Sequence, residues 1–509
     1  MYNRIKKNKK KLQSYAHTII PGLSGLLGKR PEMYLPGGNW PTYYDKAKGI
    51  TIWGIDKKKY LDFTMVGIGT SVLGYSDKDI NRTAIKTINS GSMTTLNPPE
   101  DVELAEELLK IHPWAESVKY ATTGGESMSI AIRLSRAYTQ KDKVLFCGYH
   151  GWHDWYLSAN LQSKKKLNDH LLPGLDPLGV PKGLRNSIIP FKFNDWDDLE
   201  NVVRKNAKHC SAIVLEPCRE TFPSKKYLKE IRDISKKNNC VLIFDEITSG
   251  WRINTGGAHQ KFKINPDIVV YGKTIANGIP MGAIIGKKKI MSFAVKTFIS
   301  SSFWTERLGP SCALTFIKKH KKLKLGNKLN TIGKKIKNIW HKNAKKNKLD
   351  IEIFGIDPLA SFKLKCKNWP ITITYFNQEM LKQNILASDV DTFPIKLRSA
   401  ASSAFGHLAP GGRMIVGVGV PGVLNPTDDT KSYVERSTKK GISAERQKAI
   451  VSATMVNVAA KASRLCDDEC PLIIPPNSQP DNALNAVVGV NASTLLSVAY
   501  SELAKTFVR

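Results

Sequence analysis

The chain has 509 residues, a hydrophobic fraction of 41% and a formal net charge of +33. This length is enough for two or three domains with a large buried core, and no apolar stretch reaches the roughly 18 residues that a membrane-spanning helix needs. The basic residues 1–30 lack the apolar core and cleavage site of a secretory signal, so we expect a cytoplasmic protein with no membrane partner.

The positive charge has two interpretations. Binding to nucleic acid or to an anionic membrane surface is one of them, but the lysines are spread over much of the chain and no nucleic-acid-binding motif accompanies them. We favour the other, a lysine-rich solvent-exposed surface, and expect no nucleic acid as a partner.

The 8 cysteines are scattered. Several lie in apolar runs, which indicates buried thiols in a reducing compartment.

From about Tyr60 to Gly286, short apolar runs alternate with polar helical patterns. This alternation predicts βαβ units around a parallel sheet. Most runs are continuously apolar, as in strands that are covered on both faces. The expected strands are Ser117–Thr123, Lys143–Tyr149, Ser211–Pro217, Val241–Glu246, Ile268–Lys273 and Met281–Ile285, and the expected helices include Glu126–Tyr138 and Leu228–Lys237.

A lysine-rich run follows the predicted sheet. The run Lys318–Lys348 carries Ile332, Ile336 and Trp340 at helical spacing, which predicts a surface helix with one apolar face. Short β-like runs come next, at Ile351–Phe354 and Ile371–Tyr375. We expect this region to form a smaller domain with the start of the chain. The expected division is an N-terminal segment at residues 1–59 that contributes to the small domain, a large cofactor-binding domain at 60–315, the small domain at 316–390 and an unassigned C-terminal segment at 391–509.

The composition changes near Phe393, where lysine becomes rarer and alanine, valine and serine become more frequent. The segment beyond it has a Gly/Pro-rich stretch at Ala409–Pro426 and a helical pattern at Ala444–Arg464, and we find no repeat or catalytic motif in it. A separate domain, a fused segment and a sequence-assembly artefact all agree with this composition.

Two charged residues stand at the ends of predicted strands. Lys273 ends an apolar strand and precedes a glycine-bearing turn, and burial lowers the pKa of a lysine enough to make it a nucleophile near neutral pH. Asp245 ends the most apolar strand, where a carboxylate needs a cation or hydrogen bonds. Taken alone, each is more often structural, as a surface lysine or as a helix-capping aspartate.

Two further features also follow strands. In Thr123-Gly124-Gly125 a strand end leads directly into a helix, so backbone amides can approach a phosphate that the helix dipole also favours. Tyr149 lies in an aromatic cluster beyond the next strand, although such clusters are more often packing than a cofactor face. The nearby pair His150 and His153 lacks accompanying carboxylate or cysteine ligands, so we expect no metal.

These four features match one cofactor. Pyridoxal phosphate requires a lysine for a Schiff base, an acid that faces the pyridine nitrogen, a stacking partner for the ring and an amide cradle for the phosphate. Lys273, Asp245, Tyr149 and the pair Gly124 and Gly125 supply these groups, each at a predicted strand end. The sequence therefore predicts pyridoxal 5'-phosphate as the cofactor.

The same residues resemble the class III, fold type I family of aminotransferases, with the strongest likeness to glutamate-1-semialdehyde 2,1-aminomutase and to aminotransferases of polysaccharide loci. The resemblance covers about Pro21 to Ala387 and implies an α/β fold with a large, mostly parallel sheet domain and a smaller α+β domain. Its motifs are Asp245–Arg252 (close to D-E-x-x-x-G-x-R), Tyr271-Gly272-Lys273, Tyr149-His150-Gly151, Leu215-Glu216-Pro217 and Ser300–Pro310.

The resemblance also implies a role for each candidate residue. Lys273 is expected to form the Schiff base and carry the proton, Asp245 to pair with the pyridine nitrogen, and Tyr149 to stack on the ring. The remaining cofactor contacts are expected from Thr123, Gly124 and Gly125 at the phosphate, Glu216 near the far side of the ring, and Ser302 or Thr305 at the phosphate of a neighbouring subunit. A site shared between subunits implies a homodimer.

The chain departs from the family pattern in three places. The aminomutase cradle usually reads Ser-Gly-Thr, whereas Thr123-Gly124-Gly125 loses a hydroxyl donor. The arginine that binds the substrate carboxylate has no certain counterpart, since Arg30 lies in the right neighbourhood but not in the right motif. The likeness also stops near Ser388.

The expected activity is amino-group transfer between an amino donor and a carbonyl acceptor, which includes sugar-derived carbonyls, or the intramolecular transfer of an aminomutase. The alternative is a catalytically degenerate or fused protein of this fold with a binding role.

Overall fold

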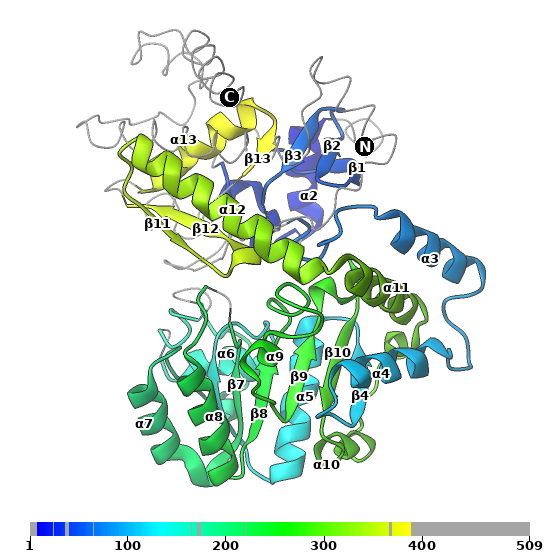
Figure 1. The fold of residues 1–509 in the computed structure, drawn as a ribbon, viewed down its shortest axis with the longest axis vertical. Helices are drawn as coiled ribbons and strands as arrows, with labels where there is room; N and C mark the ends of the chain where they lie inside the picture. The colour runs from blue at the N-terminus through cyan, green and yellow to red at the C-terminus, as the bar shows by residue number, and fades with distance from the viewer. Residues whose placement is uncertain are drawn as a thin grey trace.

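A computed structural model of the chain describes residues 8–387, apart from 24, 36–39, 65, 164, 171–174, 219 and 366–368. The sequence-based expectations for residues 391–509, including the helical pattern at Ala444–Arg464, lie outside the described residues. Figure 1 shows a lower part built on a large sheet and an upper part that holds β1–β3, α12, α13 and the ends of the described chain. No helix in the described ranges has the length and apolar character needed to cross a membrane.

The lower part is organised around a sheet of 7 strands in the order β4-β10-β9-β8-β7-β5-β6. Neighbouring strands from β6 to β9 pair in parallel, and β10 pairs antiparallel to both β9 and β4. The prediction of a mostly parallel sheet is thereby confirmed. The strands are β4 (Ser117–Ala121), β5 (Lys143–Cys147), β6 (Ile188–Pro190), β7 (Cys210–Leu215), β8 (Val241–Asp245), β9 (Ile268–Tyr271) and β10 (Gly282–Gly286).

Both faces of this sheet are buried, which explains why its strands are continuously apolar. In β5, Leu145 packs into one core cluster while Val144 and Phe146 pack into the other. Each buried aliphatic or aromatic side chain contributes about 1.5–3 kcal/mol. The helices of this part are α3 (Lys78–Asn89), α4 (Glu100–Ile111), α5 (Gly124–Thr139), α6 (Asp154–Leu157), α7 (Trp196–Asn206), α8 (Lys225–Lys237), α9 (Ala258–Phe262), α10 (Lys288–Met291) and α11 (Leu308–Leu323).

The upper part brings together the two ends of the described chain. The short strand β13 (Ile385–Leu386) pairs in parallel with β3 (Lys59–Asp62), at the edge of the sheet β1-β2-β3-β13. A separate antiparallel pair joins β11 to β12. The other elements of this part are α2 (Lys9–Ile19), β1 (Tyr44–Lys48), β2 (Thr51–Gly54), α12 (Leu325–Lys346), β11 (Ile351–Phe354), β12 (Ser361–Leu364) and α13 (Trp369–Lys382).

Two sequence-based expectations for this part need correction. The run Ile371–Tyr375 is not a strand but lies inside α13, because Ile373, Phe376 and Met380 are buried at helical spacing, and this burial outweighs the local β propensity of isoleucine and threonine. The lysine-rich run forms two helices rather than one, since α11 ends where Lys324 adopts a left-handed backbone with φ 47°. The predicted apolar face is present in α12, where Ile336 and Trp340 are buried.

Candidate active site

Lys273 lies in a turn directly after β9. The chain passes from Tyr271 through Gly272 into a short 3-10 helix that starts at Lys273, η6 (Lys273–Ala276). The backbone of Lys273 has φ 44°, a left-handed conformation that is uncommon outside glycine and asparagine and that clusters at functional sites. The half-buried side chain donates a hydrogen bond from Nζ to Oγ1 of Thr248 at 2.9 Å.

Asp245 ends β8 and is paired with His150. Its Oδ2 lies 2.8 Å from Nδ1 of His150, and its Oδ1 accepts the Ile247 amide at 3.0 Å. The other ring nitrogen of His150, Nε2, lies 3.1 Å from the carbonyl oxygen of Cys147. A carbonyl can only accept, so Nε2 carries a proton and a second proton must lie between His150 and Asp245. Burial raises the pKa of the Asp245 carboxyl, and the contact with His150 offsets this only in part.

The start of α5 is closely packed against the turns that hold Lys273 and Asp245. Thr123 caps the helix through a reciprocal capping box with Glu126. A Cβ atom on Gly124 would lie 2.9 Å from Cδ1 of Ile247. A Cβ atom on Gly272, next to Lys273, would lie 3.9 Å from Cα of Gly124. The first amides of a helix have no partner within it. The close approach of Gly124 to Gly272 therefore brings the free amides of α5 near the turn that carries Lys273.

Tyr149 and Glu216 lie at the ends of the two neighbouring strands, β5 and β7. The Tyr149 amide donates to Oε2 of Glu216 at 3.1 Å, and Glu216 is 6% exposed. A Cβ atom on Gly148, whose φ is 112°, would lie 2.8 Å from the same carboxylate oxygen. The charge of Glu216 also acts on Asp245, whose pKa it helps to raise.

The fold therefore gathers most of the predicted residues at one edge of the sheet. Lys273, Asp245, Tyr149, Glu216 and the cradle at Thr123, Gly124 and Gly125 all follow the carboxyl ends of strands, where ligands of such sheets bind. Ser302 and Thr305 lie instead on an exposed 3-10 helix, η8 (Ser302–Thr305). The Thr305 hydroxyl donates to the Ser302 carbonyl at 2.9 Å and also contacts Sδ of Met93 at 3.6 Å.

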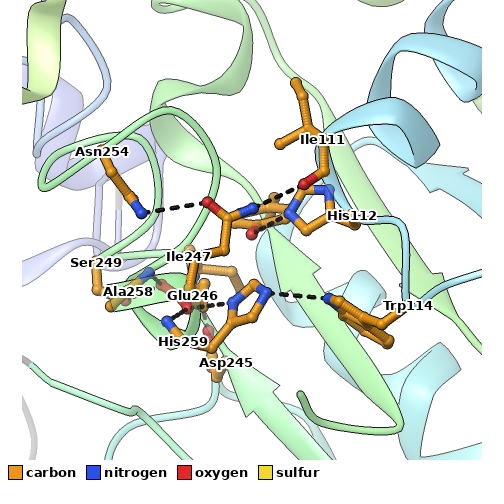
Figure 2. A network of polar contacts seen from close by, with 12 residues as sticks. Ile111, His112, Trp114, Asp245, Glu246, Ile247, Ser249, Asn254, Ala258 and His259 are labelled. Carbon is orange, nitrogen blue, oxygen red and sulfur yellow. Dashed lines mark hydrogen bonds and ion pairs between the residues drawn. The ribbon is translucent and has the colours of Figure 1, made fainter. Parts of the chain in front are cut away.

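A buried polar network around Glu246, the residue after Asp245, is drawn in Figure 2. Glu246 is inaccessible to solvent and accepts hydrogen bonds from the Ser249 hydroxyl at 2.7 Å, the Ala258 amide at 2.8 Å, and the His259 amide and Nδ1 at 2.9 Å. Burial alone would raise the pKa of this carboxyl, but its donors leave the pKa of Glu246 below its usual value. The network continues to Trp114, whose Nε1 donates a hydrogen bond to Nε2 of His259 at 3.3 Å.

A second buried contact anchors the strand before Lys273. Nδ1 of His112 lies 2.7 Å from the Leu108 carbonyl, so this nitrogen is the donor and Nε2 accepts the Tyr271 hydroxyl at 2.8 Å. Burial lowers the pKa of His112 to about 4, and the imidazole is neutral near pH 7. The residue after Asp245 and the residue two before Lys273 are thus both tied to buried imidazoles.

Three of these partners were not singled out from the sequence. His150 was weighed only as a metal ligand, although it directly follows Tyr149, and among the described residues no group of His, Cys, Asp and Glu could hold a metal ion. Thr248 lies within the Asp245–Arg252 motif, which was the available signal for it. Glu246 lies in the same motif, but its partner His259 could be identified only from the fold.

Comparison with known proteins gives one family. The model of the class III aminotransferases matches residues 35–356. The chain is 32% identical over 311 residues to 3-aminobutyryl-CoA aminotransferase of Cloacimonas acidaminovorans, a match that covers 59% of this chain and 70% of the relative. It is 33% identical over 327 residues to glutamate-1-semialdehyde 2,1-aminomutase of Nitrosopumilus maritimus, which covers 62% of this chain and 73% of the relative.

A similar fold occurs among solved structures. The FumI protein of Sphingopyxis sp. MTA144, in its PLP internal aldimine form, aligns with a TM-score of 0.69 and 19% identity over 89% of this chain and 96% of that one. An omega-transaminase from Sphaerobacter thermophilus aligns with a TM-score of 0.67 and 20% identity over 90% and 99%. At these identities the likeness concerns the fold, and the family follows from the sequence matches. The chain belongs to the class III aminotransferases, which are pyridoxal-phosphate-dependent enzymes.

Proposed function

We propose that this enzyme transfers an amino group through pyridoxal phosphate, with Lys273 as the residue that holds the cofactor and moves the proton. The observation that carries the proposal is the meeting of Lys273, Asp245 and the Gly124–Gly125 cradle at one edge of the sheet. The substrates are an amino donor and a carbonyl acceptor, which includes a sugar-derived carbonyl, or a single molecule that carries both groups, as in an aminomutase.

The residues at this edge fit the cofactor on their own chemistry. A side chain at Gly124 would meet Ile247 and one at Gly125 would meet His153, so this packing requires glycine at both positions. The first amides of α5 have no partner within the helix and are donors suited to a phosphate. Asp245 is 2% exposed, and among the described residues no Lys or Arg side chain contributes to its electrostatic surroundings. A protonated pyridine nitrogen would supply the missing positive charge.

When bound, pyridoxal phosphate acts as an electron sink for the bonds at the substrate carbon. The chain's own residues provide the proton chemistry. Nζ of Lys273 is oriented by the Thr248 hydroxyl at 2.9 Å, so the amine has a fixed position from which to accept and return a proton. His150 holds the Asp245 carboxylate in place through the contact of 2.8 Å between Nδ1 and Oδ2.

Two reaction types agree with the names of the relatives. One relative is named as an aminotransferase and the other as a 2,1-aminomutase. We propose that the carbon that loses the amino group and the carbon that receives it both belong to small molecules. An aminotransferase needs a separate acceptor molecule, whereas an aminomutase does not. Glutamate-1-semialdehyde supplied alone distinguishes them, since only an aminomutase would turn it into 5-aminolevulinate without an added carbonyl compound.

We propose a homodimer in which η8 of one subunit approaches the phosphate of the other. Exposed apolar side chains support this, because Leu96 is 80% exposed and Phe303, within η8, is 69% exposed. Met93, which is 40% exposed, contacts Thr305 of η8 through Sδ at 3.6 Å and adds to the apolar surface beside η8. Exposed apolar patches are typical of protein interfaces. Ser302 and Thr305, on the same short helix, would then lie near the partner's cofactor.

The 5 cysteines in the described part of the chain are free and buried, which supports a reducing compartment such as the cytoplasm.

The test is the visible absorption spectrum of the full chain with excess pyridoxal phosphate, before and after glutamate is added. We expect a band that shifts with the amine, that Lys273→Ala abolishes and that Lys288→Ala, at an exposed lysine, leaves unchanged. A cofactor that binds without any response to a series of amines would instead support the alternative of a degenerate protein with a binding role. No band at all would contradict both.

A further inference from the structure

His153 lies against the start of α5, at Gly125. A Cβ atom on Gly125 would lie 2.6 Å from Cε1 and 2.7 Å from Nδ1 of the His153 ring. The imidazole therefore occupies the space that a side chain at position 125 would need. Glycine at 125 is a requirement of this contact, because any larger residue would displace the ring.

The contact leaves one ring nitrogen without a partner. Nδ1 of His153 is buried and makes no hydrogen bond within the described part of the chain. A buried nitrogen of this kind destabilises a structure by about 1–3 kcal/mol unless something pairs with it. The ring packs against the first turn of α5, whose free amides are donors, as a protonated Nδ1 would be. A single anion with several acceptor oxygens would satisfy both.

The ring is held in place from two other directions. It stacks on Trp152 with ring centroids 4.6 Å apart and an angle of 27° between the planes. The intervening loop also approaches the helix closely, because a Cβ atom on Gly151, whose φ is 104°, would lie 3.2 Å from Cα of Gly125. His153 is thus positioned by packing rather than by hydrogen bonds of its own ring, which leaves its nitrogen available for a ligand.

We propose that His153 is a ligand of the cofactor phosphate and donates a hydrogen bond from Nδ1 next to the amides of Gly124 and Gly125. This inference rests on pyridoxal phosphate as the cofactor. It assigns to the Tyr149–His153 loop a phosphate contact in addition to the aromatic face of Tyr149. It also accounts for a cradle that carries no hydroxyl at position 125, since an imidazole from the neighbouring loop supplies the donor instead.

The experiment compares two forms of the cofactor that differ only in the phosphate. Full-length chain freed of cofactor is titrated with pyridoxal phosphate and with pyridoxal, and affinity is read from absorbance. For His153→Ala and His153→Phe we expect affinity for pyridoxal phosphate to fall about tenfold to hundredfold, as for a hydrogen bond to a charged group. Affinity for pyridoxal should stay within about twofold. Phenylalanine keeps the stacking on Trp152, so it separates the lost donor from lost packing.

Two further variants complete the comparison. His209→Ala removes an exposed histidine and should leave both affinities unchanged. Gly125→Thr in the His153→Ala background places a hydroxyl where the ring was and should restore part of the lost affinity, whereas Gly125→Thr alone should weaken binding because the methyl-bearing side chain meets the ring.

Three results would overturn the proposal. Unchanged affinity for pyridoxal phosphate in both His153 variants would show that Nδ1 does not contact the phosphate. Equal losses for pyridoxal and pyridoxal phosphate would reduce His153 to a packing residue. Failure of the unsubstituted chain to bind pyridoxal phosphate would overturn the cofactor assignment as well, and so differs from the first two results, which leave the proposed function intact.

Discussion

Asp245 and Glu246 are adjacent carboxylates, both buried, yet their pKa values shift in opposite directions. Glu246 receives four hydrogen bonds from uncharged donors and from His259, which lower its pKa despite burial. Asp245 receives one amide and shares a proton with His150, and its pKa rises. Glu246 is thereby fully satisfied by neighbouring donors, whereas Asp245 relies on His150 and one amide.

Buried neutral histidines make stability depend on pH. Burial lowers the pKa of His112 and of His320 to about 4 each, from 6.5. Between pH 6.5 and 4 the unfolded chain takes up protons at these positions and the folded chain does not, so stability falls as the pH falls through this window. Each histidine contributes up to about 3 kcal/mol to this loss, most of which is complete by pH 4.

His320→Gln tests this pH dependence. The Gln amide can replace Nε2 as donor to the Trp251 carbonyl but does not titrate. We expect the variant to lose about 2 kcal/mol less than the unsubstituted chain between pH 7.5 and 5, measured by urea unfolding at both values. Identical losses for the two proteins would mean that His320 takes up its proton over the same pH range in the folded chain as in the unfolded chain.

Among the elements, the strands of the large sheet could be predicted and the smaller elements only in part. Continuous apolar runs identified β5, β7, β8 and β9 because both faces of the sheet are buried. The three-residue β6 ends in Pro190 and gave no such signal. Ile371–Tyr375 has the composition of a strand, and only the spacing of its buried neighbours Ile373 and Phe376 shows that it belongs to α13.

The candidate site was predictable to the extent that each residue marks a strand end. Lys273, Asp245 and Gly124 follow apolar runs, so their chemistry could be read along the chain. The pairing of Asp245 with His150 depends on the lateral order of β5, β7 and β8, which no local pattern contains. The contact of His153 with the helix also joins two separate segments, Gly125 at the start of α5 and the loop after β5. No local sequence pattern contains this contact either.

The close packing of α12 on the turn before β12 gives a test at this scale. A Cβ atom on Gly333 would overlap the carbonyl of Asp357, so the helix can approach this turn only with glycine there. Gly333→Ala should lower the free energy of unfolding by about 1–3 kcal/mol, as in other overpacked sites. Gly183→Ala is the matched control, because a Cβ atom there meets no neighbouring atom, and should change stability by less than about 0.5 kcal/mol.

At the scale of the whole molecule, the surface formed by η8 and the segment that carries Leu96 has exposed apolar side chains and is held in place by polar contacts. Arg307, next to η8, forms a bidentate ion pair with Glu100 at 2.7–3.0 Å, and its amide donates to the Ser92 carbonyl at 2.8 Å. These contacts fix η8 against the segment that carries Leu96. The face is therefore preformed within a single subunit, as expected for a surface that docks with little rearrangement.

Phe303→Asp and Leu96→Asp test the proposed homodimer. A charge on this face should weaken association because it would be buried without a partner, and light scattering should give the mass of one chain rather than two. Cofactor affinity should fall at the same time, if Ser302 or Thr305 reaches the partner's phosphate. Val295→Asp is the control, because Val295 is also apolar and is 90% exposed. It should change neither the mass in solution nor the cofactor affinity. A single-chain mass for the unsubstituted protein would contradict the dimer.

The place of β10 in the sheet bears on how the protein is made. On the edge strand β4, Ala121 and its neighbours pair with β10 alone, through partners such as Gly282. A ribosome that synthesises the chain from its amino end releases β4 and the start of α5 first, and then everything up to Lys273, before β10 emerges. Until that point β4 has no sheet to join. The strand that leads into the phosphate cradle therefore joins the sheet only after the lysine has been made, so this part of the site is completed late in synthesis.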